Sequence, residues 1–323
     1  MKQAILPLFL PHAACPHRCI FCNQEIISRS HLPQHPERQL RNALQNLPEC
    51  YFQAEIAFFG GSFTALPEPI IRYYLDIARQ LRQEDSRIIG IRLSTRPDCI
   101  SPPILALLRE YEVTTVELGV QSMCDQVLEA SERGHRVEHT IRAMQWLKQE
   151  SVQTVLQFMP GLPKDTKQTI WQTGRAIADL KPDAVRIYPC VVLAGTRLEQ
   201  MYREGIYRPL DLDQAVEIST DLSELFQERN IQILRIGLHS DIDSGQIIAG
   251  PFHPAFGELV RQRLCRRKME KTVTAGKADN GELQIFVPVR ELSQWIGQKK
   301  ENLLYLEKKY GIRVRIKGET QIP

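Results

Sequence analysis

Up to about residue 190, short apolar runs alternate with longer amphipathic stretches. The apolar runs, which are typical of buried strands, span residues 4–10, 55–59, 88–93, 115–120, 152–159 and 184–188. The amphipathic stretches, which are typical of surface helices, span residues 36–47, 69–82, 103–111, 137–149 and 166–180. This alternation predicts an α/β fold with a parallel sheet covered by helices, and six units are too few to close an eight-unit barrel.

The end of the chain follows a different order. A strand-like run over 283–289 leads into a short helical segment ending at Gly297, and a basic turn at 298–300 precedes a helix over 301–310 and a strand over 312–317. The stretch between the two patterns is rich in Gly, Pro and His. We therefore predict a barrel domain over 1–240, a linker over 241–257 and a small α/β domain over 258–323.

Charge is distributed unequally between these parts. Residues 258–323 carry 15 Lys and Arg against 8 Asp and Glu, a net charge of +7. The whole chain has a net charge of only +3, so residues 1–257 carry −4. This asymmetry predicts that the C-terminal part meets a polyanion.

The composition narrows the class of protein. With 323 residues, of which 43% are hydrophobic and 24% charged, the chain is typical of a globular protein. The apolar run at 4–10 is interrupted by Pro7 and is too short for a signal peptide or a membrane span. Eight cysteines without a secretory signal favour a reducing compartment. We therefore expect a cytoplasmic protein that does not contact a membrane.

Three cysteines follow the first apolar run. Cys15, Cys19 and Cys22 have the spacing CxxxCxxC, with which a tight loop can bind three irons of a [4Fe–4S] cluster and leave the fourth iron open. An open metal position is typical of chemistry rather than of structural support. The alternatives are three unrelated buried thiols or a zinc site, but zinc normally takes four ligands, and His12 and His17 fit no common zinc spacing.

With these residues, the chain resembles the radical S-adenosylmethionine (SAM) superfamily, whose hallmark is CxxxCxxC with an aromatic residue, here Phe21, before the last cysteine. The resemblance implies a partial (β/α)6 barrel, a [4Fe–4S] cluster on Cys15, Cys19 and Cys22, and SAM bound at the open iron. It also implies reductive cleavage of SAM, hydrogen abstraction from a substrate, and an electron donor such as flavodoxin or ferredoxin. Whether SAM is consumed or recycled stays open.

The resemblance also implies a glycine motif after the second strand. Gly60 and Gly61 let the backbone approach a ligand closely, and Ser62 and Thr64 offer hydroxyls. In the family this motif contacts the amino group of SAM, whereas a Gly-Gly pair alone is more often a plain turn. Ser94 ends the third strand, where related enzymes carry a glutamate, and it could still bond to the ribose.

Further cofactor positions follow the first, fourth and fifth strands. The resemblance implies that Gln121 binds the ribose of SAM and that Arg133 binds its carboxylate, for which a guanidinium is well suited. Without the resemblance, Arg133 would be a solvated charge at a helix end. Phe21 and Met159 are expected to border the cofactor, although Met159 could equally pack in the core.

Within the superfamily, the chain resembles the radical domain of the Elongator catalytic subunit and, in part, the oxygen-independent coproporphyrinogen oxidases. The resemblance extends over about residues 1–240 and rests on segments 60–63, 95–98, 117–122, 133–135, 159–163 and 187–189. Elongator subunits carry an acetyltransferase domain after the radical domain, and this chain has no room for one. We therefore do not expect acetyl-CoA-dependent carboxymethylation of wobble uridine.

The C-terminal pattern resembles a KH module, in which a GxxG loop between two helices clamps the backbone of a nucleic acid. Gly297 matches the first glycine, and Lys300 stands where the last glycine should be. This change weakens the clamp but adds charge, so Gly297, Lys299 and Lys300 are candidate RNA-binding residues. The alternative is a basic appendage that only packs on the barrel.

Cys99, Cys124 and Cys190 each follow a strand and could meet over the barrel as a second cluster or a relay thiol. The alternative is that they are small buried side chains.

Three classes of function remain. The first is a radical enzyme that modifies RNA, with tRNA as the expected partner. The second is a radical enzyme acting on a small molecule or a tetrapyrrole, with a structural C-terminal domain. The third, an RNA-binding protein with a structural cluster, fits poorly with three cysteines that leave an iron open. The modified atom stays open.

Overall fold

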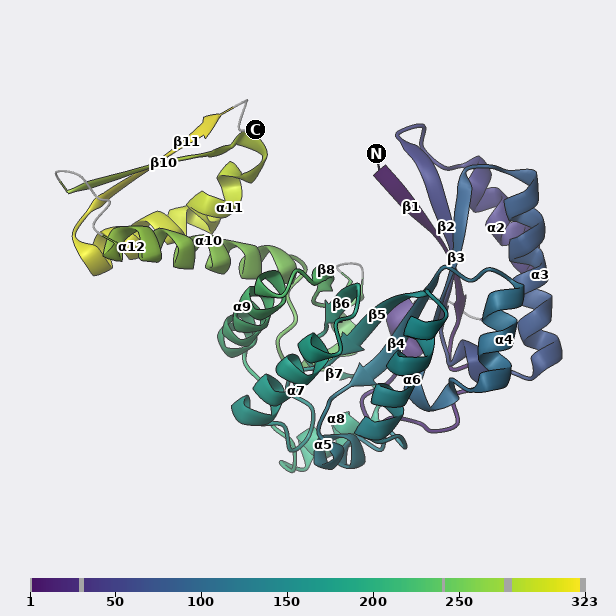
Figure 1. Ribbon diagram of the computed structural model, residues 1–323. Coiled ribbons are helices and arrows are strands. Elements are labelled where there is room, and N and C mark those ends of the chain that lie inside the picture. The colour runs from purple at the N-terminus through teal and green to yellow at the C-terminus, as the bar shows by residue number, and fades with distance from the viewer. Residues whose placement is uncertain (1, 29–31, 240–241, 276–280, 320–323) are drawn as a thin grey trace.

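The computed structural model describes residues 2–28, 32–239, 242–275 and 281–319. Its core is one sheet of seven parallel strands whose order in the sheet follows their order in the chain (Figure 1). The strands are β1 (Lys2–Leu10), β2 (Tyr51–Gly60), β3 (Ile88–Thr95), β4 (Thr115–Gln121), β5 (Gln153–Phe158), β6 (Ala184–Ile187) and β8 (Gln232–Ile236). The curled sheet confirms the predicted partial barrel.

Helices cover the outer face of this sheet (Figure 1). The longer ones are α2 (Pro36–Gln45), α3 (Glu68–Glu84), α4 (Pro102–Glu110), α6 (Val137–Gln149), α7 (Lys167–Asp179) and α9 (Leu212–Glu228). Their apolar sides pack on strand residues such as Leu8, Ile56 and Ile91, which are fully buried. Capping fixes some helix starts: the Asp211 side chain accepts a hydrogen bond from Gln214 N at the start of α9.

The short helices α1 (Gln24–Ser28), α5 (Asp125–Ala130) and α8 (Arg197–Arg203) follow the carboxyl ends of strands. Two further short strands, β7 (Val192–Leu193) and β9 (Ile247–Ala249), pair antiparallel. β9 lies inside the predicted linker 241–257, so part of that stretch is bonded to the barrel. Among the described residues, no helix has the length and apolar character needed to cross a bilayer.

The C-terminal module, which we define as residues 256–319, has the predicted order of elements from residue 282 onward, but it begins with a long helix that was not predicted. Helix α10 (Phe256–Thr274) precedes β10 (Glu282–Pro288), α11 (Leu292–Ile296), the 3-10 turn Gln298–Lys300, α12 (Glu301–Tyr310) and β11 (Arg313–Glu319). β10 and β11 pair in parallel, and helices pack on one face of this small sheet (Figure 1). The likeness to a KH module stays a prediction.

Helix α10 is shared between the barrel and the rest of the module. On one side, Arg263 and Arg267 form ion pairs with acidic residues of α9. On another side, Met269 is fully buried with Leu283 and Leu306 of the module. The predicted boundary near residue 258 therefore falls at the start of a helix that serves both parts.

Candidate active site

A cavity of about 470 Å³ lies on the inner face of the curled sheet. Its lining draws on β1 to β6, on β8 and on the loops after them. The lining includes nearly all the residues predicted to hold the cluster and SAM, namely Cys15, Cys19, Phe21, Cys22, Gly60, Gly61, Ser62, Ser94, Gln121, Arg133 and Met159. The fold therefore brings together side chains from six separate stretches of the chain.

Thr64 is an exception, since it is buried outside the lining of the cavity. It lies in the 3-10 helix Phe63–Ala65, where its Oγ1 donates to the carbonyl of Cys99 at 2.7 Å. Thr95 Oγ1 lies 2.7 Å away on its other side. These bonds use its hydroxyl to join two loops, and the structure does not bring Thr64 into the lining of the cavity, so its contact with SAM stays a prediction.

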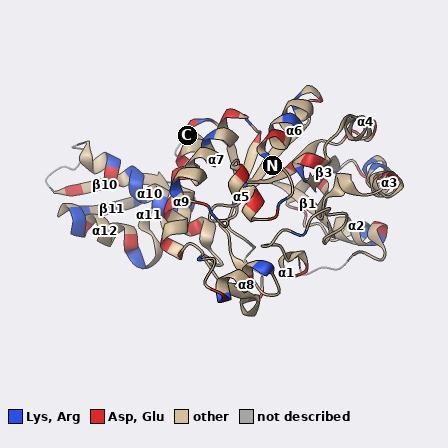
Figure 2. Cartoon of the chain, turned by 90° about the horizontal axis from the view of Figure 1, so that it is seen from below, with Lys and Arg blue, Asp and Glu red and all other residues tan. Residues whose placement is uncertain are grey.

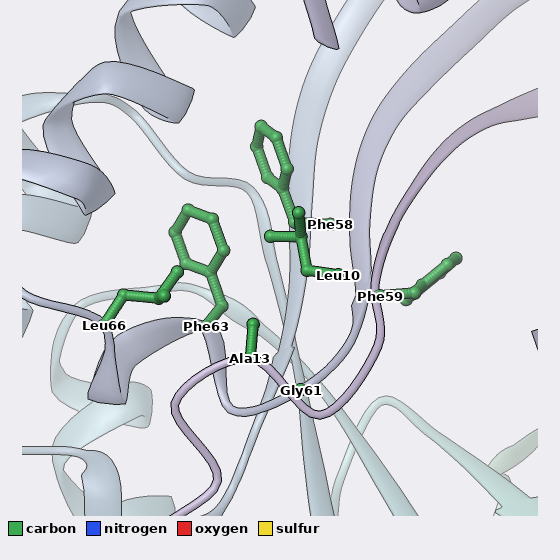
Figure 3. A pocket seen from close by; sticks show the side chains of 7 residues that line it. All are labelled: Leu10, Ala13, Phe58, Phe59, Gly61, Phe63 and Leu66. Carbon is green, nitrogen blue, oxygen red and sulfur yellow. The ribbon is translucent and has the colours of Figure 1, made fainter. Parts of the chain in front are cut away.

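The cysteine loop is fastened to the glycine motif by backbone hydrogen bonds. Gly61 N donates to Leu10 O at 2.7 Å, and Ser62 N donates to Ala13 O at 3.0 Å. A Cβ added to Gly61 would lie 2.1 Å from Ala13 O, so no side chain fits at this position. Figure 3 shows Ala13 beside Gly61, close to the stacked rings of Phe58 and Phe63. Position 61 therefore requires glycine because two backbones meet there.

The three cysteines line one part of the cavity and interact electrostatically. Burial, together with the charges of Cys19 and Cys15, raises the pKa of Cys22 to about 12. Arg133 opposes this, and its Nη1 donates to Cys19 Sγ at 3.2 Å. Three neighbouring thiols beside a cation are a donor set that fits an iron–sulfur cluster, which takes one thiolate at each of several irons. Among the described side chains, no group of three or more His, Cys, Asp and Glu is arranged to hold a single metal ion.

Three residues that line the cavity have a buried polar atom without a hydrogen-bond partner in the described part of the chain. These atoms are Arg96 Nη1, Gln121 Oε1 and Arg133 Nε, and the last two belong to residues predicted to bind SAM. Arg133 is held in place because its Nη2 donates to Gly119 O at 2.6 Å. Buried polar atoms are normally paired, so those of Gln121 and Arg133 indicate where a ligand supplies the missing partner. A carboxylate for Arg133 and a hydroxyl for Gln121 are what SAM offers, so these residues fit the cofactor.

The sequence did not indicate a pair of hydrogen bonds that joins the cysteine loop to helix α1. His12 N donates to Gln24 Oε1 at 2.6 Å, and Gln24 N donates to His12 Nε2 at 3.0 Å. Gln24 Nε2 also donates to Gly60 O, at the end of β2. Burial and nearby Arg18 lower the pKa of His12, which favours the neutral ring that can accept this bond. Nothing in the spacing of His12 and Gln24 indicates the pairing.

A network of charged side chains, which was also missed, reaches the wall of the cavity through Glu117 and Arg186. Arg92 donates to Glu55 Oε2 at 2.6 Å and to Glu117 Oε1 at 2.9 Å. Arg186 binds both carboxylate oxygens of Glu117, at 2.9 and 3.0 Å. The two carboxylates and two guanidiniums balance each other. The sequence signal was a charged residue within each otherwise apolar strand.

The remaining cysteines do not line the cavity. Cys124 and Cys190 pack in an apolar cluster with Phe21 and Leu162. Burial raises the pKa of Cys190 to about 12 and that of Cys99 to about 11. These three thiols therefore fit the structural alternative, as small side chains that pack between elements.

The comparisons with known proteins agree with this geometry. Residues 10–177 match the model of the Radical SAM superfamily, and residues 182–266 match that of the Radical_SAM C-terminal domain. The chain belongs to the radical SAM superfamily. It is an enzyme of this type, and its cofactors are a [4Fe–4S] cluster and SAM.

Relatives include proteins of the Elongator type, as the sequence predicted. An uncharacterised protein of Methanocaldococcus jannaschii is 31% identical over 223 residues, which are 65% of this chain and 68% of that protein. The tRNA uridine(34) acetyltransferase of the same organism is 34% identical over 181 residues, 54% of this chain. This chain spans only 32% of that relative's length.

A solved structure of similar fold is the archaeal Elp3 of Methanocaldococcus infernus with an N-terminal deletion. Its TM-score is 0.67 and its identity 24%, with 84% of this chain and 63% of that chain covered. At this identity the likeness concerns the fold. It includes the partial barrel that carries the cavity.

Proposed function

We propose that this radical SAM enzyme acts on RNA, and that its substrate is a tRNA. The proposal is supported by the basic C-terminal module and by the tRNA-modifying enzymes named among the relatives. Cys15, Cys19 and Cys22 would hold the cluster, Arg133 the carboxylate of SAM, and Gln121 its ribose. When bound, the two cofactors supply a radical that abstracts a hydrogen atom from the substrate.

The charge count alone overstates the attraction for RNA. The α10 residues Arg263, Arg267 and Lys271 form ion pairs with acidic side chains of α9. Much of the opposite charge of the two parts is therefore neutralised where they meet. Figure 2 shows Lys and Arg on α10, α12 and β11. Within the described chain, exposed basic residues of the module without an ion pair are Lys268, Lys299, Lys300, Lys308, Arg313 and Lys317.

The observation that carries the proposal is the turn that presents Lys299 and Lys300. Both have left-handed backbones, with φ of 49° and 64°, and both side chains are exposed. The turn is bonded to helix α10, since Gln298 N donates to Gln262 Oε1 at 3.3 Å and Asn302 Nδ2 donates to Gln262 O at 2.9 Å. Two cations on a turn that is held in place favour contact with the phosphates that repeat along the backbone of an RNA.

A second feature of the module also favours RNA. The outer face of the β10–β11 sheet exposes Phe286, which is 50% accessible, and Lys317 Nζ lies 5.9 Å from the centre of its ring. An exposed aromatic ring beside cations is a surface on which an unpaired base can stack. A module that only packed on the barrel would need neither this ring nor the lysine turn.

The test is the salt dependence of tRNA binding. Phosphate contacts release counterions, so log K should fall with log salt with a slope of about −3 to −5. Lys299→Ala with Lys300→Ala should flatten the slope by about one to two and weaken all RNAs nearly equally. The matched control is Lys164→Ala with Lys181→Ala, because both are exposed lysines with left-handed backbones on the barrel.

Binding is measured by titrating tRNA into the three proteins at several salt concentrations. The control should keep the wild-type slope. Equal slopes in all three proteins would contradict the role of the turn. Weak binding without salt dependence would favour the second function, a small-molecule substrate.

A further inference from the structure

The wall of the cavity formed by β6 and β8 contains a positive charge that the fold does not neutralise. Arg186 on β6 and Arg235 on β8 are directly paired in the sheet register, so their side chains leave the same face side by side. Both line the cavity. Like charges directly opposite one another on adjacent strands are destabilising unless something compensates them.

Only one of the two arginines has an anionic partner. Arg186 binds both carboxylate oxygens of Glu117. Arg235 makes a hydrogen bond from Nε to the carbonyl of Gly237 at 3.3 Å, and no ion pair joins it to another described residue. Glu117 is already shared with Arg92, so its charge is fully engaged. The guanidinium of Arg235 therefore faces the cavity without a carboxylate.

The surroundings of Arg235 fit an anion. Tyr188 follows β6, is buried, and lines the same cavity close to both arginines. Its hydroxyl and the guanidinium groups are all hydrogen-bond donors. Several hydrogen-bond donors that line the same part of a cavity can together bind an anionic group that has two or more oxygens. Among the described residues that line this cavity, Glu117 is the only Asp or Glu.

The cofactors do not account for this charge. The cysteine loop follows β1 and is bonded through Ile20 and Asn23 to Leu198 and Ala194 beyond β7, whereas Arg235 lies on β8. The carboxylate of SAM already has its partner in Arg133, next to Cys19. SAM contains no other anionic group. An anionic group that enters the cavity can therefore pair with Arg235, which has no carboxylate partner among the described residues.

We propose that Arg235, with Arg186 and Tyr188 beside it, binds an anionic group of the substrate, a phosphate or a carboxylate, on the wall of the cavity formed by β6 and β8. A substrate held there lies across the cavity, with one end fixed and the atom to be modified directed toward the cluster. The proposal rests on the radical chemistry of the family and does not require that the substrate is RNA.

The experiment uses the protein reconstituted with its cluster and with SAM. Wild type, Arg235→Gln and the control Arg208→Gln are titrated calorimetrically with inorganic phosphate and with succinate at constant ionic strength. Arg208 is exposed and outside the cavity, so its variant loses the same charge elsewhere. We expect Arg235→Gln to bind the preferred anion about tenfold more weakly or worse, and Arg208→Gln to bind it as wild type does.

The preferred probe identifies the source of the anion. A preference for phosphate indicates a nucleotide phosphate, and a preference for succinate indicates a small carboxylate substrate. Lys299→Ala with Lys300→Ala should leave this binding unchanged, so a failure of the RNA proposal is distinguishable from a failure of this one. Wild type that binds neither probe, or Arg235→Gln that binds both equally well, would overturn the inference.

Melting temperature provides a second measurement. Because Arg235 repels Arg186, Arg235→Gln should melt at the same temperature as wild type or higher in the absence of anions. A clearly lower melting temperature would assign Arg235 a structural role and would also overturn the proposal.

Discussion

In the barrel, Glu55 and Glu117 are buried on the inner face of the sheet and are joined by Arg92, whose side chain is 11% exposed, whereas Lys299 and Lys300 in the module are exposed to solvent. The buried charges have fixed partners and distances, so they can hold a small ligand in one orientation. The exposed charges have no such partners and attract any polyanion. Under the proposed function, the barrel determines where chemistry occurs and the module contributes affinity for RNA.

The largest expected effect is the complete loss of iron from the barrel while the module still binds tRNA. Replacing Cys15, Cys19 and Cys22 with Ala should abolish iron binding, since each thiolate holds a different iron. Binding of tRNA by the same protein should persist, because the module does not depend on the cluster. Iron content after anaerobic reconstitution and a tRNA titration test both points. Full iron in the triple variant would show that the cluster lies elsewhere.

A second prediction compares buried with exposed ion pairs. Arg92→Ala leaves Glu55 and Glu117 buried without their shared partner and should lower the free energy of unfolding by about 3–5 kcal/mol. Arg315→Ala breaks the exposed pair with Glu282, which lies 2.9 Å away in the module, and should cost about 0–1 kcal/mol. Denaturant unfolding measures both. Similar losses of unfolding free energy in the two variants would contradict the expected difference between buried and exposed ion pairs.

A third prediction concerns SAM. Arg133→Ala removes the charge-assisted partner of a desolvated carboxylate and should weaken SAM binding by about 1.5–3 kcal/mol. The Arg208→Gln protein, which loses an exposed charge, is the reference. Equilibrium dialysis with labelled SAM measures the affinity, and an unchanged affinity in Arg133→Ala would remove Arg133 from the cofactor site.

The smallest effect depends on pH. Burial raises the pKa of Asp165 to about 6, against the bonds it accepts from Thr169 and Gly161. Below this pKa the folded protein holds a proton that the unfolded chain has already lost, so stability falls as pH rises toward 6 and then levels off. From pH 5 to 7 this loss should be about 1–2 kcal/mol. Asp165→Asn should not lose stability over this pH range. If the free energies of unfolding of the two proteins changed in parallel with pH, the raised pKa of Asp165 would be contradicted.

The strands and the cofactor loop were predictable because their signals are local. The first six strands form continuous apolar runs, and the spacing of three cysteines is readable directly. The seventh strand, β8, was missed because Gln232–Ile236 has only three apolar residues, divided by Arg235, and none of its residues is fully buried, so the run does not resemble a buried strand.

The site features that the sequence did not indicate depend on contacts between distant segments. Thr64 follows the glycine motif in sequence, yet its hydroxyl bonds to the loop after β3. The network joining Glu55 to Arg186 has members on β2, β3, β4 and β6, and it is complete only when these strands and β5 between them are in register. Pattern and spacing describe neighbours along the chain, whereas these pairings arise only from the fold.

Helix α10 limits how the chain can change in length. An α-helix turns by about 100° per residue, so its sides keep their directions only if no residue is added or removed. Arg263 and Arg267 must face α9 while Gln262 and Met269 face the module along the same few turns. A single inserted residue would rotate one set of contacts away from its partners. Homologues that keep both contact sets should therefore have an α10 of constant length, with insertions confined to the surrounding loops.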